Sequence, residues 1–73
     1  MYEFLLVKRY DSFYSCYQYG ILQREYDMGS WRTAACIPDI ACNEEFVTKL
    51  ITRCSSGLLS PVHLLDVVMD SLP

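Results

Sequence analysis

The residues best suited to chemistry lie near the C-terminus, at His63, Asp66 and Asp70. Their i, i+3, i+7 spacing would place one imidazole and two carboxylates on one face of a helix. Such a set could bind a divalent metal ion or orient a general base. An ordinary surface helix shows the same charged stripe opposite its apolar side, with His63 paired electrostatically to Asp66. We expect this simpler arrangement, because the sequence offers no further ligand, and we keep metal or small-ligand binding by this face as the alternative.

The cysteines offer a second kind of chemistry, nucleophilic catalysis. The chain has four of them: Cys16, Cys36, Cys42 and Cys54. No two have the C-x-x-C spacing, and only His63 is available as a base. We therefore expect free thiols rather than zinc ligands or disulfides, and no cofactor. An enzyme is the least favoured class, because no nucleophile, base and orienting group can be assembled.

Aromatic residues form the third candidate site. Six Tyr, three Phe and one Trp stand among 73 residues. Along residues 13–26 apolar and aromatic side chains occupy both alternating positions, whereas a sheet covered on one side should be mostly polar on the other. Half-exposed tyrosines are tolerated on many surfaces, but a continuous apolar patch usually marks a contact surface. We predict an interaction surface for a partner protein or a second copy of the chain, formed by Tyr14, Tyr17, Tyr19 and Trp31.

Three strands are expected to carry these aromatic residues. Residues 2–10, 13–26 and 31–37 are rich in strand-forming residues and are separated by short turns. Gly20, inside the second strand, suggests a bulge or a close backbone approach. The Pro38-Asp39 pair is expected to end the third strand. Short connections favour an antiparallel meander in which the strands keep their sequence order.

Two amphipathic helices are predicted over residues 43–56 and 60–72. Asn43 is a good N-cap for the first helix, and Gly57 is expected to end it in the left-handed conformation. The apolar arc of this helix contains Phe46, Val47, Leu50, Ile51, Cys54 and Leu58. We expect Cys54 to be buried in the core as a small hydrophobic residue.

The second helix is expected to begin at Ser60 as N-cap, with Pro61 at its first position. Its apolar arc contains Val62, Leu64, Leu65, Val68, Met69 and Leu72, whereas Val67 falls on the polar side. This arc is expected to close the core over the sheet. The predicted fold is a single α+β domain, residues 1–73, with a three-stranded antiparallel meander packed against two C-terminal helices.

The charge balance excludes several kinds of partner. The formal net charge is −3, and the basic residues are scattered along the chain as Lys8, Arg9, Arg24, Arg32, Lys49 and Arg53. Nucleic-acid and polybasic membrane binding need clustered cations, so we expect neither partner. No run approaches the roughly 20 apolar residues of a membrane span, and no signal peptide is visible. We therefore expect a cytoplasmic location.

Three segments resemble a known family: Tyr19-Gly20-Ile21, Pro38-Asp39-Ile40, and the closing Ser60-Pro61-Val62-His63-Leu64-Leu65-Asp66-Val67-Val68-Met69-Asp70. They are similar to a family of small uncharacterised proteins from clostridia and related Firmicutes, which ends in Ser-Pro-x-His-Leu-x-Asp-Val-x-x-Asp. The chain departs from it at Ala41, where the family tends to Ser, and in its extra cysteines. The resemblance implies fold and lineage and assigns no activity. Together these observations predict a non-catalytic protein–protein interaction or regulatory module.

Overall fold

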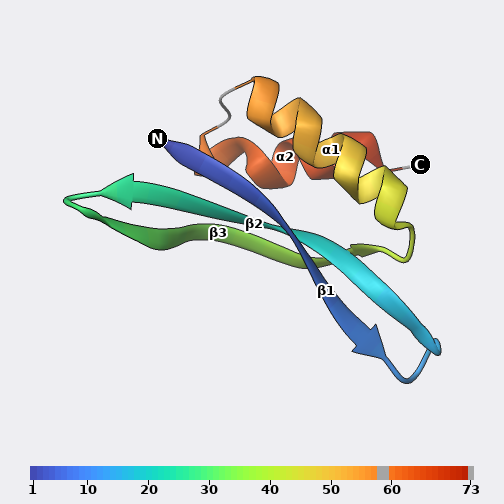
Figure 1. Ribbon diagram of the computed structural model, residues 1–73. Coiled ribbons are helices and arrows are strands. Elements are labelled where there is room, and N and C mark those ends of the chain that lie inside the picture. The colour runs from blue at the N-terminus through green and yellow to red at the C-terminus, as the bar shows by residue number, and fades with distance from the viewer. Residues whose placement is uncertain (58–59, 73) are drawn as a thin grey trace.

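The computed structural model describes residues 1–57 and 60–72 (Figure 1). Three antiparallel strands form one sheet in the order β1-β2-β3, and two helices follow them. The elements are β1 Tyr2–Asp11, β2 Cys16–Asp27, β3 Ser30–Ala41, α1 Glu44–Ser56 and α2 Pro61–Ser71. Both helices lie on the same side of the sheet, and both hairpin ends extend beyond them (Figure 1). The predicted α+β meander with two C-terminal helices is confirmed.

The strand boundaries differ from the predicted ones at two places. β2 begins at Cys16 rather than at residue 13, because Asp11 Oδ1 accepts the Phe13 N–H at 3.0 Å and starts a turn. Ser15 then has φ of 55°, which is not a strand conformation. Pro38 was expected to end the third strand, but β3 continues to Ala41. β3 is an edge strand, where a residue without an N–H is tolerated.

A large bulge in β3 explains both Pro38 and Gly20. The pairs Ile21↔Ile37 and Tyr19↔Ala41 enclose one residue on β2 but three on β3. The additional backbone folds over Gly20, where a Cβ atom would lie 2.1 Å from the Ile37 carbonyl oxygen. Only glycine leaves room for this backbone. Of the two alternatives predicted for Gly20, a bulge or a close backbone approach, the close approach is confirmed, and the bulge lies in the neighbouring strand.

The helix caps are partly as predicted. Asn43 Oδ1 accepts the Phe46 N–H at 3.1 Å, which confirms the cap of α1. The left-handed conformation expected for Gly57 is wrong: its φ is −86°, because its N–H donates to the Arg53 carbonyl at 3.1 Å and continues the helix. At the start of α2, the His63 N–H donates to the backbone carbonyl of Ser60 at 3.0 Å.

Among the described residues, no helix has the length and apolar character needed to cross a membrane.

The core lies between the sheet and the two helices. Its buried apolar residues are Ile21, Val47, Leu50, Cys54, Leu64 and Val68. The predicted arc of α1 is confirmed, since Phe46 and Ile51 also pack against this cluster, and Leu58 lies outside the described residues. The predicted burial of Cys54 is confirmed too.

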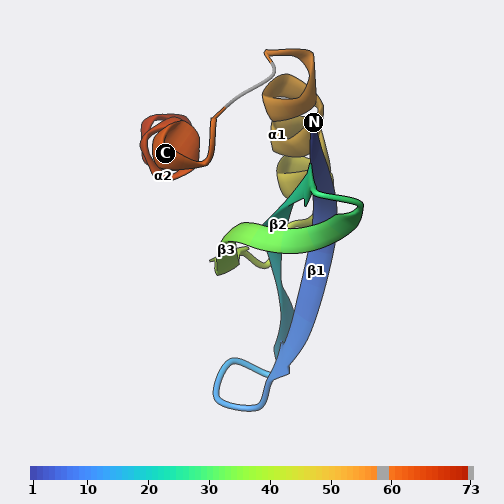
Figure 2. The same ribbon diagram turned by 90° about the vertical axis from the view of Figure 1, so that its left-hand side faces the viewer.

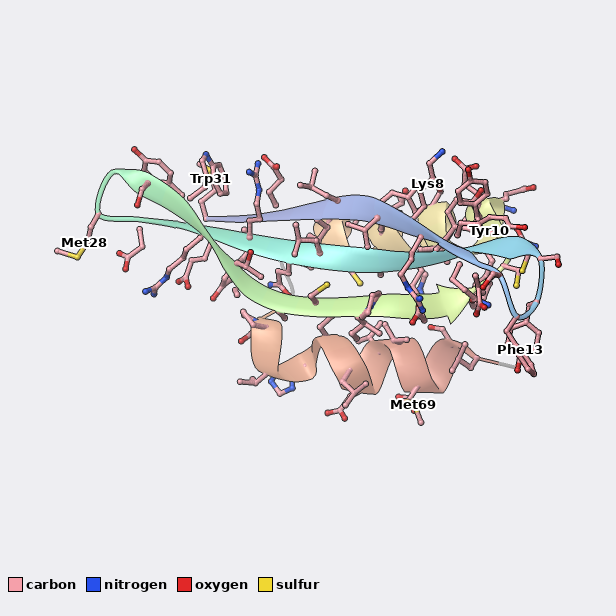
Figure 3. All side chains as sticks on the ribbon, turned by 90° about the horizontal axis from the view of Figure 1, so that it is seen from below. Lys8, Tyr10, Phe13, Met28, Trp31 and Met69 are labelled. Carbon is pink, nitrogen blue, oxygen red and sulfur yellow. The ribbon has the colours of Figure 1, made fainter. Side chains whose placement is uncertain are left out.

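The apolar arc of α2 closes the core only in part. α1 lies over β1 and β2, whereas α2 is displaced sideways and lies along β3 at the edge of the sheet (Figures 2 and 3). Leu64 and Val68 are buried, and Val67, which was assigned to the polar side, packs against the core. The outward apolar residues of the helix have no strand beneath them. Contrary to expectation, these stay exposed: Val62, Leu65, Met69 and Leu72.

Candidate functional site

The exposed apolar residues of α2 form one continuous stripe. Positions 62, 65 and 69 follow the three- and four-residue spacing that places side chains on one helix face, and Leu72 directly follows the last residue of α2. Their exposed fractions are 77% for Val62, 56% for Leu65, 62% for Met69 and 37% for Leu72. Figure 3 shows Met69 pointing away from the sheet. We call these four residues the α2 stripe.

A groove continues the α2 stripe toward α1. It has a volume of about 520 Å³ and lies where the end of β3, the start of α1 and the end of α2 meet. Its lining residues are Ile40, Ala41, Asn43, Phe46, Ser71 and Leu72. Leu72 belongs to both the groove and the α2 stripe, so the two form one surface.

Hydrogen bonds hold the walls of the groove in place. The Asn43 cap fixes the first turn of α1, from which Phe46 projects. The Ser71 hydroxyl donates to the Val67 carbonyl at 2.8 Å and accepts from Arg53 Nη1 at 3.1 Å. This contact joins the last turn of α2 to α1. The groove is therefore built into the packing of the two helices, and it is apolar apart from Asn43 and Ser71.

The aromatic residues predicted as an interaction surface are distributed over three places. Tyr17 and Tyr19 lie on the face of the sheet that carries the helices, with ring centroids 6.5 Å apart. Tyr14 lies in the turn between β1 and β2, with its ring against Phe13 at 4.8 Å. Trp31 is the second residue of β3, at the other end of the sheet (Figure 3). The structure brings Tyr17 and Tyr19 together and leaves the other two apart.

Tyr17 belongs to a small aromatic group beyond the helices. It pairs with Tyr10 across the β1–β2 hairpin, with centroids 5.4 Å apart, and the Lys8 ammonium lies 5.0 Å from the Tyr17 centroid. Tyr19 extends the row toward the core and is largely covered. Three of the tyrosines therefore contact one another within the β1–β2 hairpin.

Trp31 lies on the face of the sheet opposite the helices. Its ring contacts Tyr26 at 5.4 Å, and the Arg24 guanidinium lies 5.0 Å from its centroid. Arg24 also forms an ion pair with Glu3 across the β1–β2 pair. These contacts fill much of the surface around Trp31, whose exposed fraction is 37%.

The possible metal-binding face does not gather into a site. His63, Asp66 and Asp70 are all exposed on α2, next to the α2 stripe on the helix wheel. Among the described residues, no three His, Cys, Asp or Glu side chains are placed to hold a metal ion together. The observed arrangement is a solvated polar face.

The contact between Cys16 and Cys42 and the groove had no signal in the sequence. Cys16 and Cys42 lie 26 positions apart, yet their sulfur atoms approach to 3.0 Å because the bulge in β3 delivers Cys42 to the start of β2. Nearby, Arg9 Nη2 bonds Asp39 Oδ2 at 2.6 Å, and this contact raises the pKa of Arg9. The groove was also missed, because its residues come from three elements.

The comparisons with known proteins identify a family without an assigned activity. The model of the Family of unknown function (DUF6514) matches residues 1–73. No curated protein and no solved structure matches the chain.

Proposed function

The chain belongs to this family of unknown function, and we propose that it is a non-catalytic protein–protein interaction module that binds its partner through the α2 stripe and the adjoining groove. The observation that supports this function is the exposure of three large apolar side chains on one face of α2 and of Leu72 directly after it. Contiguous apolar surface that the fold leaves uncovered is typical of protein contact sites.

The energetics indicate that the stripe and the groove act together. The exposed fractions of the α2 stripe add up to rather more than two full side chains. Burying them would contribute about 3.5–7 kcal/mol, at about 1.5–3 kcal/mol for each fully buried side chain. Association itself costs about 4–15 kcal/mol in lost freedom. The α2 stripe alone therefore supports weak binding at most, and a partner side chain inserted beside Phe46 and Leu72 would add to it.

The charges around the stripe indicate what the partner should carry. Asp66 and Asp70 lie beside it, and α2 has no basic residue in its last turn. Two copies of α2 packed against each other would bring four carboxylates together, which disfavours a homodimer through this face. A basic amphipathic helix from another protein, with apolar anchors one turn apart, would match both the stripe and the charge.

A paired set of variants tests this function. We expect Leu65→Glu with Met69→Glu to abolish binding, and Thr52→Glu, at an exposed position of α1 outside the stripe and the groove, to retain it. Both proteins should keep the circular dichroism spectrum of the natural chain. Cross-linking mass spectrometry of the natural chain in cells should map partner contacts to α2 and the groove, and sedimentation across concentrations should report any self-association.

Two results would refute the proposal: retention of every partner by the double variant, or cross-links confined to the outer face of the sheet around Trp31. A concentration-dependent dimer that the double variant loses would replace the outside partner with a second copy. The cytoplasmic location, and the bacterial range and closing helix motif suggested for the family, stay predictions. Metal binding by His63 is not favoured by any contact in the described residues.

A further inference from the structure

Two cysteines distant in the sequence face each other at one end of the sheet. Cys16 is the first residue of β2, and Cys42 directly follows the last residue of β3. Their sulfur atoms lie 3.0 Å apart, and a disulfide bond of about 2.05 Å needs only a further approach of about 1 Å. The last β2–β3 pair is Tyr19↔Ala41, so Cys42 lies beyond the ladder and is not held by strand pairing.

The surroundings give the two sulfur atoms different roles. Gln18 Nε2 donates a hydrogen bond to Cys42 Sγ at 3.4 Å, which holds this sulfur beside Cys16. The hydrogen bond with Cys42, followed by desolvation, raises the pKa of Cys16, which therefore retains its proton. Cys42 is exposed and Cys16 is half-buried. Cys42 is thus the sulfur that a reagent in solution reaches first, and Cys16 lies behind it as the second thiol.

We propose that Cys16 and Cys42 form a redox modification site that a hydroperoxide oxidises to an intramolecular disulfide. The Cys42 thiolate attacks one peroxide oxygen, the O–O bond breaks, and the leaving hydroxide takes a proton to become water. Cys42 is then a sulfenic acid. The Cys16 sulfur attacks the Cys42 sulfur, the S–O bond breaks, and the hydroxyl leaves as water with the Cys16 proton. Two thiols and one hydrogen peroxide thus give one disulfide and two waters.

The other two cysteines serve as internal controls. Cys36 is exposed and lies in β3 before the bulge, where it pairs with Leu22 rather than with Cys16. Cys54 is buried in the core. Burial raises the pKa of the Cys54 thiol, which keeps it unreactive. A general oxidation of accessible thiols would modify Cys36 at least as readily as Cys42. A reaction that uses Cys16 and Cys42 and spares Cys36 therefore identifies the site.

The experiment uses the full chain, reduced and then treated with hydrogen peroxide. Trypsin leaves Cys36 and Cys42 on one peptide, residues 33–49, and Cys16 on another, residues 10–24. The assignment is therefore made in the Cys36→Ser variant, in which a linked pair of these peptides can only be Cys16–Cys42. We expect this linked pair, a monomeric product and the loss of two thiols. The mass should fall by two hydrogen atoms.

Single variants separate the two steps. Cys16→Ser should stop at the Cys42 sulfenic acid, which dimedone traps. Cys42→Ser should consume peroxide at least roughly tenfold more slowly, because it lacks the exposed thiol of the pair. In concentrated urea, the rate at which the Cys16–Cys42 disulfide forms should fall by a similar factor, since the fold supplies the proximity.

An equal rate in urea, or products that are chiefly Cys36-linked or intermolecular, would overturn the proposal. The proposal would also fail if dimedone labelled Cys16 in the Cys42→Ser variant as fast as it labels Cys42 in the Cys16→Ser variant. The outcome is independent of partner binding, because it is measured on the isolated chain.

Discussion

Replacing Gly20 by alanine should strongly destabilise the fold. The new Cβ would meet the Ile37 carbonyl oxygen at 2.1 Å and the Pro38 carbonyl oxygen at 2.4 Å, whereas ordinary contact begins near 3.4 Å. The clashing atoms are backbone, so no side chain can rotate away. The bulge must retreat by about 1 Å between two ladder pairs, and its hydrogen bonds must stretch or break.

The expected loss in the free energy of unfolding is about 3–4 kcal/mol. Overpacking alone costs about 1–3 kcal/mol, and each disrupted backbone hydrogen bond adds about 0.5–1.5 kcal/mol. A domain of 73 residues has a total stability of about 4–11 kcal/mol. Urea unfolding, followed by far-ultraviolet circular dichroism and Trp31 fluorescence, measures the loss directly.

The other glycines provide matched controls. Gly57 has φ of −86°, and a Cβ atom added there would lie no closer than 3.5 Å to its nearest neighbour. Gly57→Ala should therefore raise the free energy of unfolding by about 0.4–1 kcal/mol. Gly29 has φ of +83° but open space around it, so Gly29→Ala should cost only the backbone strain of about 1–2 kcal/mol. A Gly20→Ala variant within 1 kcal/mol of the natural chain would refute the steric account.

Two further predictions concern the helices. Asn43→Ala removes the acceptor of the Phe46 N–H and should lower the unfolding free energy, measured by urea denaturation, by about 1 kcal/mol. Asn43→Asp keeps an acceptor and should retain the stability. Equal urea midpoints for the alanine variant and the natural chain would contradict the cap. The raised pKa of Cys54 means that its protonated form stabilises the fold below the ordinary pKa of 9.0, and this contribution is lost as the pH rises through the raised folded value. Iodoacetamide labelling at pH 8–9, followed by mass spectrometry, should therefore modify exposed Cys36 first and Cys54 last. Early labelling of Cys54 would contradict the burial of its thiol.

Local signals were sufficient for α1 and for the strand order. The Asn43 cap and the apolar spacing of Val47, Leu50 and Cys54 are properties of one segment, and the structure uses them as predicted. The meander follows in the same way from short turns. Gly20 also indicated a close backbone approach, as a glycine inside a strand can, and the backbone of β3 makes this approach.

The site depended on tertiary geometry that a helix wheel does not contain. Three strand axes span about 10 Å, and two packed helices need about 8–10 Å between their axes. Once α1 covers β1 and β2, the axis of α2 falls at the edge of the sheet, and its outer side has nothing to cover it. The wheel gives Leu65 and Leu64 the same apolar character, yet only Leu64 is buried. The predicted aromatic surface stays a prediction, with its residues on different parts of the fold.

The bulge also constrains how the length of the chain can vary among family members. Ile37 and Ala41 both pack against the core, although three residues separate them on β3 and only one separates their partners on β2. The excess of two residues matches the two-residue period of a strand, so the phase of side chains is kept on either side. Loss of a single residue here would turn Ala41 and the groove wall to the wrong face. Length changes at this point should therefore come in twos, and a relative that lacks both extra residues no longer needs glycine opposite them.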